Sequence, residues 1–205
     1  MESIPKPIII FFSSSTSNLE EERGCLKDFE EIWNEYKHPD KPIKILKWEN
    51  RNHFRPTGMS FQDGLNLDIC ESDLIIFLFS HVLGKHTKEE YDFAVNNKKS
   101  YYILVKEPQI DSFHKQPIKW FNDFIKLRKF LNNVNNHGIL TGVTPIANLS
   151  DFQWQLSNCI ENYISHLLMD KASSKANDLF NRGKSPDMII LETIQQSLRD
   201  FPGKN

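Results

Sequence analysis

The stretch Ser72–Val95, SDLIIFLFSHVLGKHTKEEYDFAV, joins an apolar run to a segment with helical periodicity. The run Asp73–Phe79 shows no alternation of apolar and polar residues, which is typical of a strand buried on both faces of a parallel sheet. The periodic segment extends from Thr87 to about Asn97 and predicts a helix soon after the strand. A buried strand followed by a helix is the repeating unit of an α/β fold.

The same pattern recurs on both sides of this stretch. Compact apolar runs predict further strands at Pro7–Phe12, Ile43–Trp48, Ser100–Val105 and Gly138–Val143. Helical periodicity predicts helices over 17–36, 61–70, 117–133 and 149–168, the first of them starting at Ser17 with a Ser17–Glu20 capping box. We therefore expect an α/β fold with a central parallel sheet of about five strands.

Composition bounds the domain organisation. The 205 residues are 39% hydrophobic and 25% charged, which indicates one soluble globular domain with a modest addition. We assign the domain to residues 1–170, and residues 171–205 to a polar tail in which Met188–Leu198 regains helical periodicity. The tail is expected to pack on the domain, to mediate assembly, or to lead to a sensor domain or partner protein.

Charge and cysteine usage argue against several functions. Lys+Arg 25 against Asp+Glu 27 leaves a net charge of −2, so neither direct nucleic-acid binding nor attraction to a membrane surface is expected. Strand-sized apolar runs and an N-terminus without a signal-peptide pattern predict a cytoplasmic protein with no membrane span. Cys25, Cys70 and Cys159 are expected to be buried small hydrophobes. The cysteines and His53, His81 and His86 lack metal-ligand spacing, so we expect no metal site.

Candidate binding residues follow the predicted strands, since ligands of open α/β sheets bind outside the carboxyl ends of the strands. Ser13, Ser14 and Ser80 offer hydroxyls that suit a ribose or a diphosphate, although such serines equally serve as turn and cap residues. Trp48 either stacks on a planar ring of a ligand or belongs to the core. Arg55 meets a phosphate, a neighbouring subunit or only solvent.

Glu90 has two interpretations from the residues alone. The spacing in Thr87–Glu90, TKEE, fits a capping box in which the Glu90 carboxylate bonds back to the Thr87 amide. The position of Glu90 after the strand Asp73–Phe79 also brings it to the ligand-binding edge of the sheet. A carboxylate committed to the cap is not available to a ligand.

Three passages together resemble Toll/interleukin-1 receptor (TIR) domains, and bacterial TIR-like proteins in particular: Ile8–Arg23, Trp48–Phe61 and Ser72–Val95. The resemblance covers most of residues 7–168 and implies a flavodoxin-like three-layer fold. It implies cleavage of NAD at the nicotinamide–ribose bond, as in many bacterial members. It also implies that the catalytic residue is Glu90, in Glu90-Tyr-Asp-Phe-Ala94, with Glu89 as the fallback. The sequence departs from the family in having His86-Thr87-Lys88 where a Trp often precedes the glutamate.

One carboxylate is chemically adequate for that reaction. The nicotinamide of NAD already carries a positive charge and leaves as a neutral molecule, so no acid is needed to protonate it, unlike the sugar alkoxide of an ordinary glycosidase. A single glutamate can stabilise the oxocarbenium-like ribose that remains. NAD is then the substrate, and no cofactor is expected.

The leading expectation is an NAD+ glycohydrolase of bacterial anti-phage defence that is activated by self-association through the Pro/Gly-punctuated loop 51–59. Two alternatives stay open. One is a non-enzymatic TIR interaction module in which Glu90 is only a helix cap. The other is an enzyme like the nucleoside deoxyribosyltransferases, which exchange bases and in which Glu90 would be a nucleophile.

Overall fold

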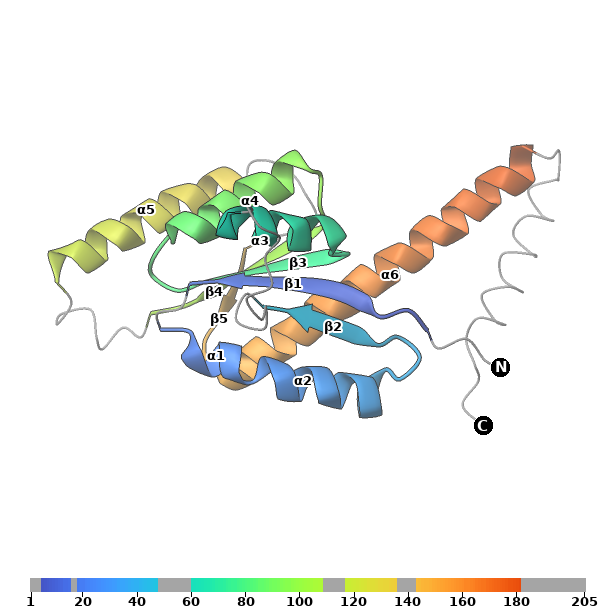
Figure 1. The fold of residues 1–205 in the computed structure, drawn as a ribbon, viewed down its shortest axis with the longest axis horizontal. Coiled ribbons are helices and arrows are strands. Elements are labelled where there is room, and N and C mark those ends of the chain that lie inside the picture. The colour runs from blue at the N-terminus through green and yellow to red at the C-terminus, as the bar shows by residue number, and fades with distance from the viewer. Residues whose placement is uncertain (1–4, 16–17, 48–59, 109–116, 136–142, 182–205) are drawn as a thin grey trace. The chain divides into compact units, whose positions relative to one another are not determined.

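The computed structural model describes residues 5–15, 18–47, 60–108, 117–135 and 143–181 (Figure 1). Its centre is a sheet of five strands, β1 (Ile8–Ser14), β2 (Ile43–Leu46), β3 (Leu74–Phe79), β4 (Tyr101–Lys106) and β5 (Val143–Ile146). The strand order is β2-β1-β3-β4-β5, and every neighbouring pair is parallel. This order is the flavodoxin-like one. The predicted fold class is therefore confirmed.

The position of β3 in the sheet explains its unalternating sequence. It pairs with β1 on one side and β4 on the other, and all six of its residues are buried. Because successive side chains point to opposite faces, a strand covered on both faces requires apolar residues at every position. The edge strand β5 is less regular and contains Pro145, whose missing N–H is tolerated at an edge. It runs from Val143 to Ile146, later than predicted, and residues 138–142 lie outside the described residues.

The helices follow the predicted order with shifted boundaries. They are α1 (Glu20–Gly24), α2 (Leu26–Ile32), the π-helical turn η1 (Trp33–Lys37), α3 (Phe61–Glu71), α4 (Lys85–Asn96), α5 (Ile118–Asn135) and α6 (Leu149–Asn181). The start predicted at Ser17 is wrong, because α1 begins at Glu20 with Leu19 as its N-cap residue and no side-chain cap. Leu19 is completely buried, so packing of this residue fixes where the helix starts. Ser17 itself lies outside the described residues.

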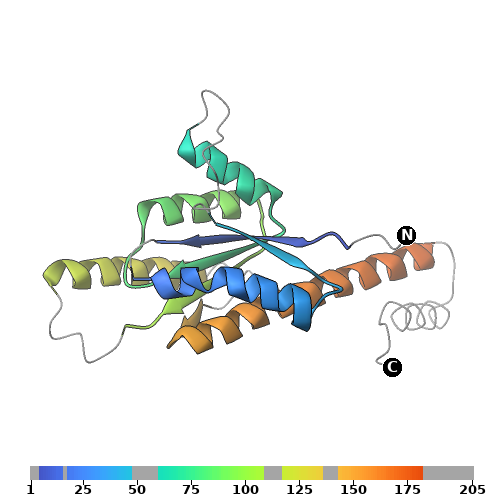
Figure 2. The same cartoon turned by 60° about the horizontal axis from the view of Figure 1, so that its bottom comes forward.

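Two helical layers cover the sheet (Figures 1 and 2). On one face, Leu65 of α3, Tyr91 of α4 and Leu127 of α5 join a buried cluster with alternate residues of β1, β3 and β4. On the other face, the ring of Phe12 in β1 meets the edge of Phe152 at the start of α6, with ring centroids 6.0 Å apart. Helices α1 and α2 lie on this second side. Leu26 of α2 and Trp33 of the adjoining η1 are buried. The chain thus forms the expected three layers.

The contacts divide the chain into two compact units, Met1–Leu156 and Ser157–Asn205. Helix α6 continues to Asn181, beyond the end predicted at Leu168. The division at 170/171 stays a prediction, and the predicted helix Met188–Leu198 lies outside the described residues. None of the helices within the described ranges is long and apolar enough to cross a membrane.

The three cysteines differ in burial. Cys159 is buried, Cys25 is half-buried and Cys70 is exposed, so the prediction of a buried thiol is wrong for Cys70. The buried side of α3 is formed by Leu65, Asp68 and Ile69. Cys70 comes one residue after Ile69, and the 3.6-residue period turns its side chain away from the sheet.

Candidate functional site

A cavity of about 340 Å³ lies where β1, α3 and α4 meet at the carboxyl end of the sheet. It is lined by Ser14, Ser15, Phe61, Leu65, Gly84, Lys85, His86, Thr87 and Glu90. One lysine, one histidine and three hydroxyls therefore share the site with an apolar wall from α3. A cavity with few polar groups at this edge of a parallel sheet is typical of a ligand site in an open α/β fold.

Glu90 is held in this site by Ser13. The Ser13 hydroxyl donates a hydrogen bond to Oε2 of Glu90 across 77 residues of sequence. Both side chains are buried, with exposed fractions of 2% for Ser13 and 7% for Glu90. Among the described residues, none donates a hydrogen bond to the second carboxylate oxygen, Oε1. One oxygen is thus held by the protein, and Glu90 also lines the cavity.

Burial raises the pKa of Glu90 to about 7. Removal of the carboxylate from water is the largest cause, because a low-dielectric surrounding disfavours the charged form. The Ser13 hydrogen bond and the nearby imidazole of His86 oppose this rise, whereas the Glu89 carboxylate adds to it. A raised carboxyl pKa in a cavity is typical of functional sites, because it prepares the group to take up or release a proton near neutral pH.

The structure contradicts the helix-cap interpretation of Glu90. Helix α4 begins at Lys85, two residues before Thr87, and its N-cap residue is Gly84, with no side-chain cap. The first helical hydrogen bond runs from the Lys88 amide to the Gly84 carbonyl. Thr87 is therefore the third residue of the helix and not its N-cap residue, and the Glu90 carboxylate accepts its hydrogen bond from Ser13 instead. This carboxylate is not used as a cap.

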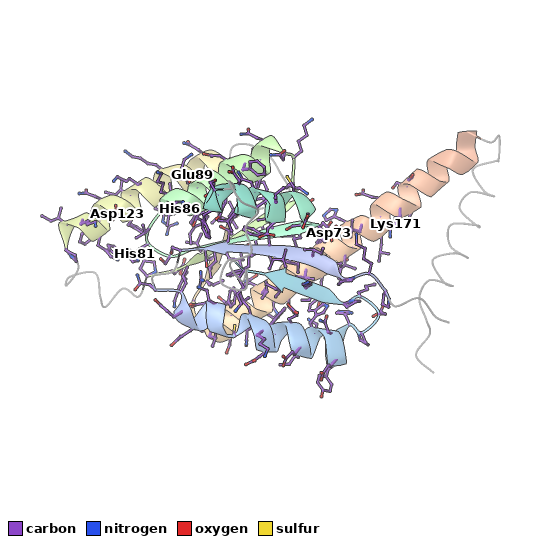
Figure 3. The ribbon with its side chains drawn as sticks, in the orientation of Figure 1. Asp73, His81, His86, Glu89, Asp123 and Lys171 are labelled. Carbon is purple, nitrogen blue, oxygen red and sulfur yellow. The ribbon has the colours of Figure 1, made fainter. Side chains whose placement is uncertain are left out.

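The two neighbouring glutamates are clearly distinguished. Glu89 Oε2 lies 3.3 Å from Nδ1 of His86, and Oε1 lies 3.8 Å from Nζ of Lys85. His86 is exposed and Glu89 is half-buried, and the two side chains lie one turn apart on α4 (Figure 3). Glu89 does not line the cavity, whereas Glu90 does. The helical rotation of 100° per residue separates the two roles.

Arg23 is a site residue that the sequence analysis missed. Its guanidinium, largely buried, donates to the Ser14 hydroxyl at 3.0 Å and to the Ser14 carbonyl at 3.4 Å. Burial lowers the pKa of Arg23, and the carboxylate of Glu20 opposes this shift. The side chain thus ties α1 to the end of β1, directly beside the cavity. No sequence spacing indicates this contact, because it joins a strand end to a helix through the packing of the two layers.

The remaining predicted site residues divide into two groups. Ser80 is buried, and its hydroxyl has no hydrogen-bond partner in the described part of the chain, but it does not line the cavity. Trp48 and Arg55, like the loop 51–59, lie outside the described residues. Of the five predicted substrate-binding residues, two are therefore at the site: Ser13 donates a hydrogen bond to Glu90, and Ser14 lines the cavity.

Two histidines at this end of the sheet have different surroundings. His86 lines the cavity, whereas the ring of His81 stacks on Trp120 of α5, with centroids 5.3 Å apart. Burial lowers the pKa of His81, and the nearby Asp123 opposes this shift. Across the described ranges, no three His, Cys, Asp or Glu side chains form a group that could hold a metal ion.

No protein-family model and no curated protein matches the sequence. Among solved structures, the chain is similar to the TIR domains of the activated Roq1 resistosome directly recognizing the pathogen effector XopQ. The two sequences are 14% identical, the match covers 75% of this chain and 99% of that chain, and the TM-score is 0.45. It is also similar to a protein named as a quinone reductase from Klebsiella pneumoniae, with 10% identity, coverage of 75% and 83%, and a TM-score of 0.40. Both likenesses concern the fold and not the activity.

Fold and site together define a class. The chain is an α/β protein of flavodoxin-like topology with a single buried glutamate, held by a strand-end serine, in a cavity at the carboxyl end of its sheet.

Proposed function

We propose that this protein hydrolyses NAD+ at the nicotinamide–ribose bond, with Glu90 as the catalytic residue. The observation that carries the proposal is a buried carboxylate that lines a cavity, with one oxygen held by Ser13. The resemblance of Ile8–Arg23, Trp48–Phe61 and Ser72–Val95 to TIR domains supplies the substrate class. Hydroxyls of Ser14, Ser15 and Thr87 are chemically suited to a ribose or diphosphate.

The proposed chemistry requires a negative charge close to the reacting ribose. As the bond from C1′ to the nicotinamide nitrogen breaks, its electron pair stays with nicotinamide, which leaves neutral, and positive charge develops on the ribose. An ionised Glu90 stabilises that charge, and the burial of its side chain strengthens the interaction. Water then bonds to C1′ and its proton passes to Glu90, whose pKa of about 7 suits a general base. The cation of the bound substrate favours the ionised form of Glu90 at the start.

The test is NAD+ consumption and nicotinamide release by the purified full chain, alone and forcibly assembled by fusion to an oligomeric carrier. Glu90→Gln is expected to lower the rate by at least about 100-fold, the usual effect of removing an electrostatic catalyst. The matched control is Glu89→Gln, which removes the adjacent carboxylate outside the cavity and is expected to retain activity. Equal rates for wild type and Glu90→Gln would remove Glu90 from the mechanism.

The same assay distinguishes the two alternatives. Base exchange would appear as a new nucleoside when a nucleoside and a free base are supplied together, with Glu90 as the nucleophile. A non-enzymatic interaction module would show no conversion of either substrate in the assembled state. The cap role of Glu90 that accompanied the interaction module is contradicted by the start of α4 at Lys85.

The biological setting that we propose is a cytoplasmic effector of bacterial anti-phage defence, activated by self-assembly, with the loop 51–59 and the tail 171–205 as contacts to copies or partners. The sequence resemblance alone supports it. Expression of the wild type in bacteria is expected to deplete NAD+ and arrest growth, whereas Glu90→Gln at equal abundance is not. Growth arrest without NAD+ depletion would contradict the proposed activity.

A further inference from the structure

We propose that α5 of one copy docks on α2 and η1 of a second copy, through two exposed helix faces of opposite charge. The first is the α5 face, which consists of Ile118, Phe121, Ile125, Arg128 and Lys129. The second is the α2 face, which consists of Asp28, Ile32, Glu35 and Tyr36. This interface is independent of the proposed activity.

The α5 face is an apolar stripe with cations. Ile118, Phe121 and Ile125 recur at spacings of three and four and have exposed fractions of 81%, 37% and 51%. This spacing places them on one side of the helix, opposite Leu127 and Leu131, which are buried in the core. Arg128 and Lys129 fall within the same arc, and both are exposed. Single exposed apolar residues are normal, but three in one stripe indicate a contact surface.

The α2 face has the complementary character. Ile32 and Tyr36 are four residues apart and have exposed fractions of 58% and 79%. Asp28 and Glu35 lie on the same side of the helix, and both are exposed. Over residues 20–37 the exposed charges are five acids and two bases, whereas α5 carries four exposed cations and one half-buried acid. Although the net charge of the chain is near zero, the α2 face is acidic and the α5 face is basic.

The positions of the two faces determine which assembly they can form. Helix α5 packs on the sheet face formed by Phe77 and Ile103, and α2 lies on the other side of the sheet (Figure 1). A single chain cannot bring its own two faces together. The contact must therefore join different faces of different copies, and such a heterologous contact repeats into an open chain or a ring.

A second copy is favoured over a membrane because the acidic partner surface is present on the chain itself. An anionic lipid surface would suit the basic α5 face but would repel the α2 face. With few apolar residues on each side, the contact belongs to the weak, transient class, and it is expected to depend on protein concentration and to weaken with salt. Such an interface forms mainly when copies are held close together.

The test is a charge exchange on the full chain, measured by sedimentation or light scattering over a range of concentrations. R128E/K129E is expected to weaken association by about tenfold, since it reverses two exposed charge pairs that each contribute modestly. D28K/E35K is expected to weaken it similarly. Mixing the two variants restores association, because each reversed face then meets an oppositely charged partner. Ile125→Asp is expected to weaken association in every combination.

The matched control reverses two cations of α5 that lie off the face. K119E/K126E makes the same change in net charge and is expected to leave association unchanged. Circular dichroism of each variant verifies that the helices are retained. Association that R128E/K129E weakens but mixing does not restore would contradict docking on the α2 face. A wild type that stays monomeric and binds phosphatidylserine vesicles through Arg128 and Lys129 would replace the second copy with a membrane.

Discussion

The Ser13 hydroxyl stabilises the ionised carboxylate of Glu90, whereas burial disfavours it more strongly. The contribution of Glu90 to the free energy of unfolding therefore depends on pH. The folded chain holds the Glu90 proton up to a pKa of about 7, above the ordinary value of 4.5. Because the folded state then binds more protons than the unfolded state, stability falls as the pH rises from about 4.5 to 7. The penalty is complete above pH 7 and absent below the ordinary value.

Glu90→Gln is therefore expected to stabilise the protein at pH 8, by up to about 3 kcal/mol, and to have little effect at pH 4. Gln retains an oxygen to accept the Ser13 hydrogen bond and has no charge to bury. Urea denaturation of both forms across this pH range measures the difference. A helix cap would give the opposite sign, because loss of its charged acceptor weakens the helix.

Ser13 is expected to set the pKa of Glu90. Its hydroxyl stabilises the ionised carboxylate, so Ser13→Ala should move the pKa of Glu90 further above 7. The acid limb of the activity profile, or the Glu90 carboxyl resonance in NMR, should move to higher pH. Ser80→Ala is the matched control, since it removes a buried hydroxyl that has no partner among the described residues, and it should leave this pKa unchanged. An unchanged pKa in Ser13→Ala would show that the contact does not act on protonation.

At the scale of elements, α3 forms the apolar wall of the cavity and depends on its cap. The Ser60 hydroxyl accepts a hydrogen bond from the Asp63 amide at 3.1 Å, and the Ser60 amide donates to the Asp63 carboxylate at 3.1 Å. Ser60→Ala is expected to cost about 1 kcal/mol of stability. In a double-mutant cycle, Asp63→Asn should cost less in the Ser60→Ala background than in the wild type, because the two residues form one motif. Additive effects in denaturation would contradict that coupling.

A buried ion pair connects α1 to the end of β4. Nζ of Lys106 lies 2.7 Å from Oε1 of Glu22, whose side chain is 1% exposed. Lys106→Met is expected to cost about 3 kcal/mol, because it leaves a carboxylate buried without its cation, and Glu22→Gln in the same chain should recover much of the loss. Thermal denaturation of the single and double variants measures both effects.

At the scale of the whole molecule, an aromatic cluster packs the central strand β3 against helix α4 and strand β4. Phe77 is completely buried and meets the edges of Tyr91 in α4 and Tyr101 in β4, with ring centroids 5.6 and 6.0 Å apart. Phe77→Ala is expected to lower the free energy of unfolding by about 3–5 kcal/mol. Phe121→Ala, on the exposed α5 face, should cost far less. Similar losses in denaturation would contradict the central place of β3.

By itself, the sequence determined the elements and the fold class. Runs such as Leu74–Phe79 predict buried parallel strands because a strand covered on both faces excludes polar residues from every position. The same reasoning predicts that Ser13, Ser14 and Glu90 lie at one edge of the sheet. Strand positions and strand ends follow from burial and periodicity, and both are visible in a local sequence pattern.

Tertiary structure alone decided the helix starts and the contacts of the site. A side-chain cap contributes about 1 kcal/mol, so packing easily overrides it, as at Leu19, and TKEE forms no cap once α4 begins at Lys85. The bonds from Ser13 to Glu90 and from Arg23 to Ser14 join elements whose register and layer positions no local pattern encodes. Whether Glu90 caps a helix or lines the cavity depends on how α4 packs against β1. That packing brings the Glu90 carboxylate to the Ser13 hydroxyl, which is its only hydrogen-bond donor among the described residues.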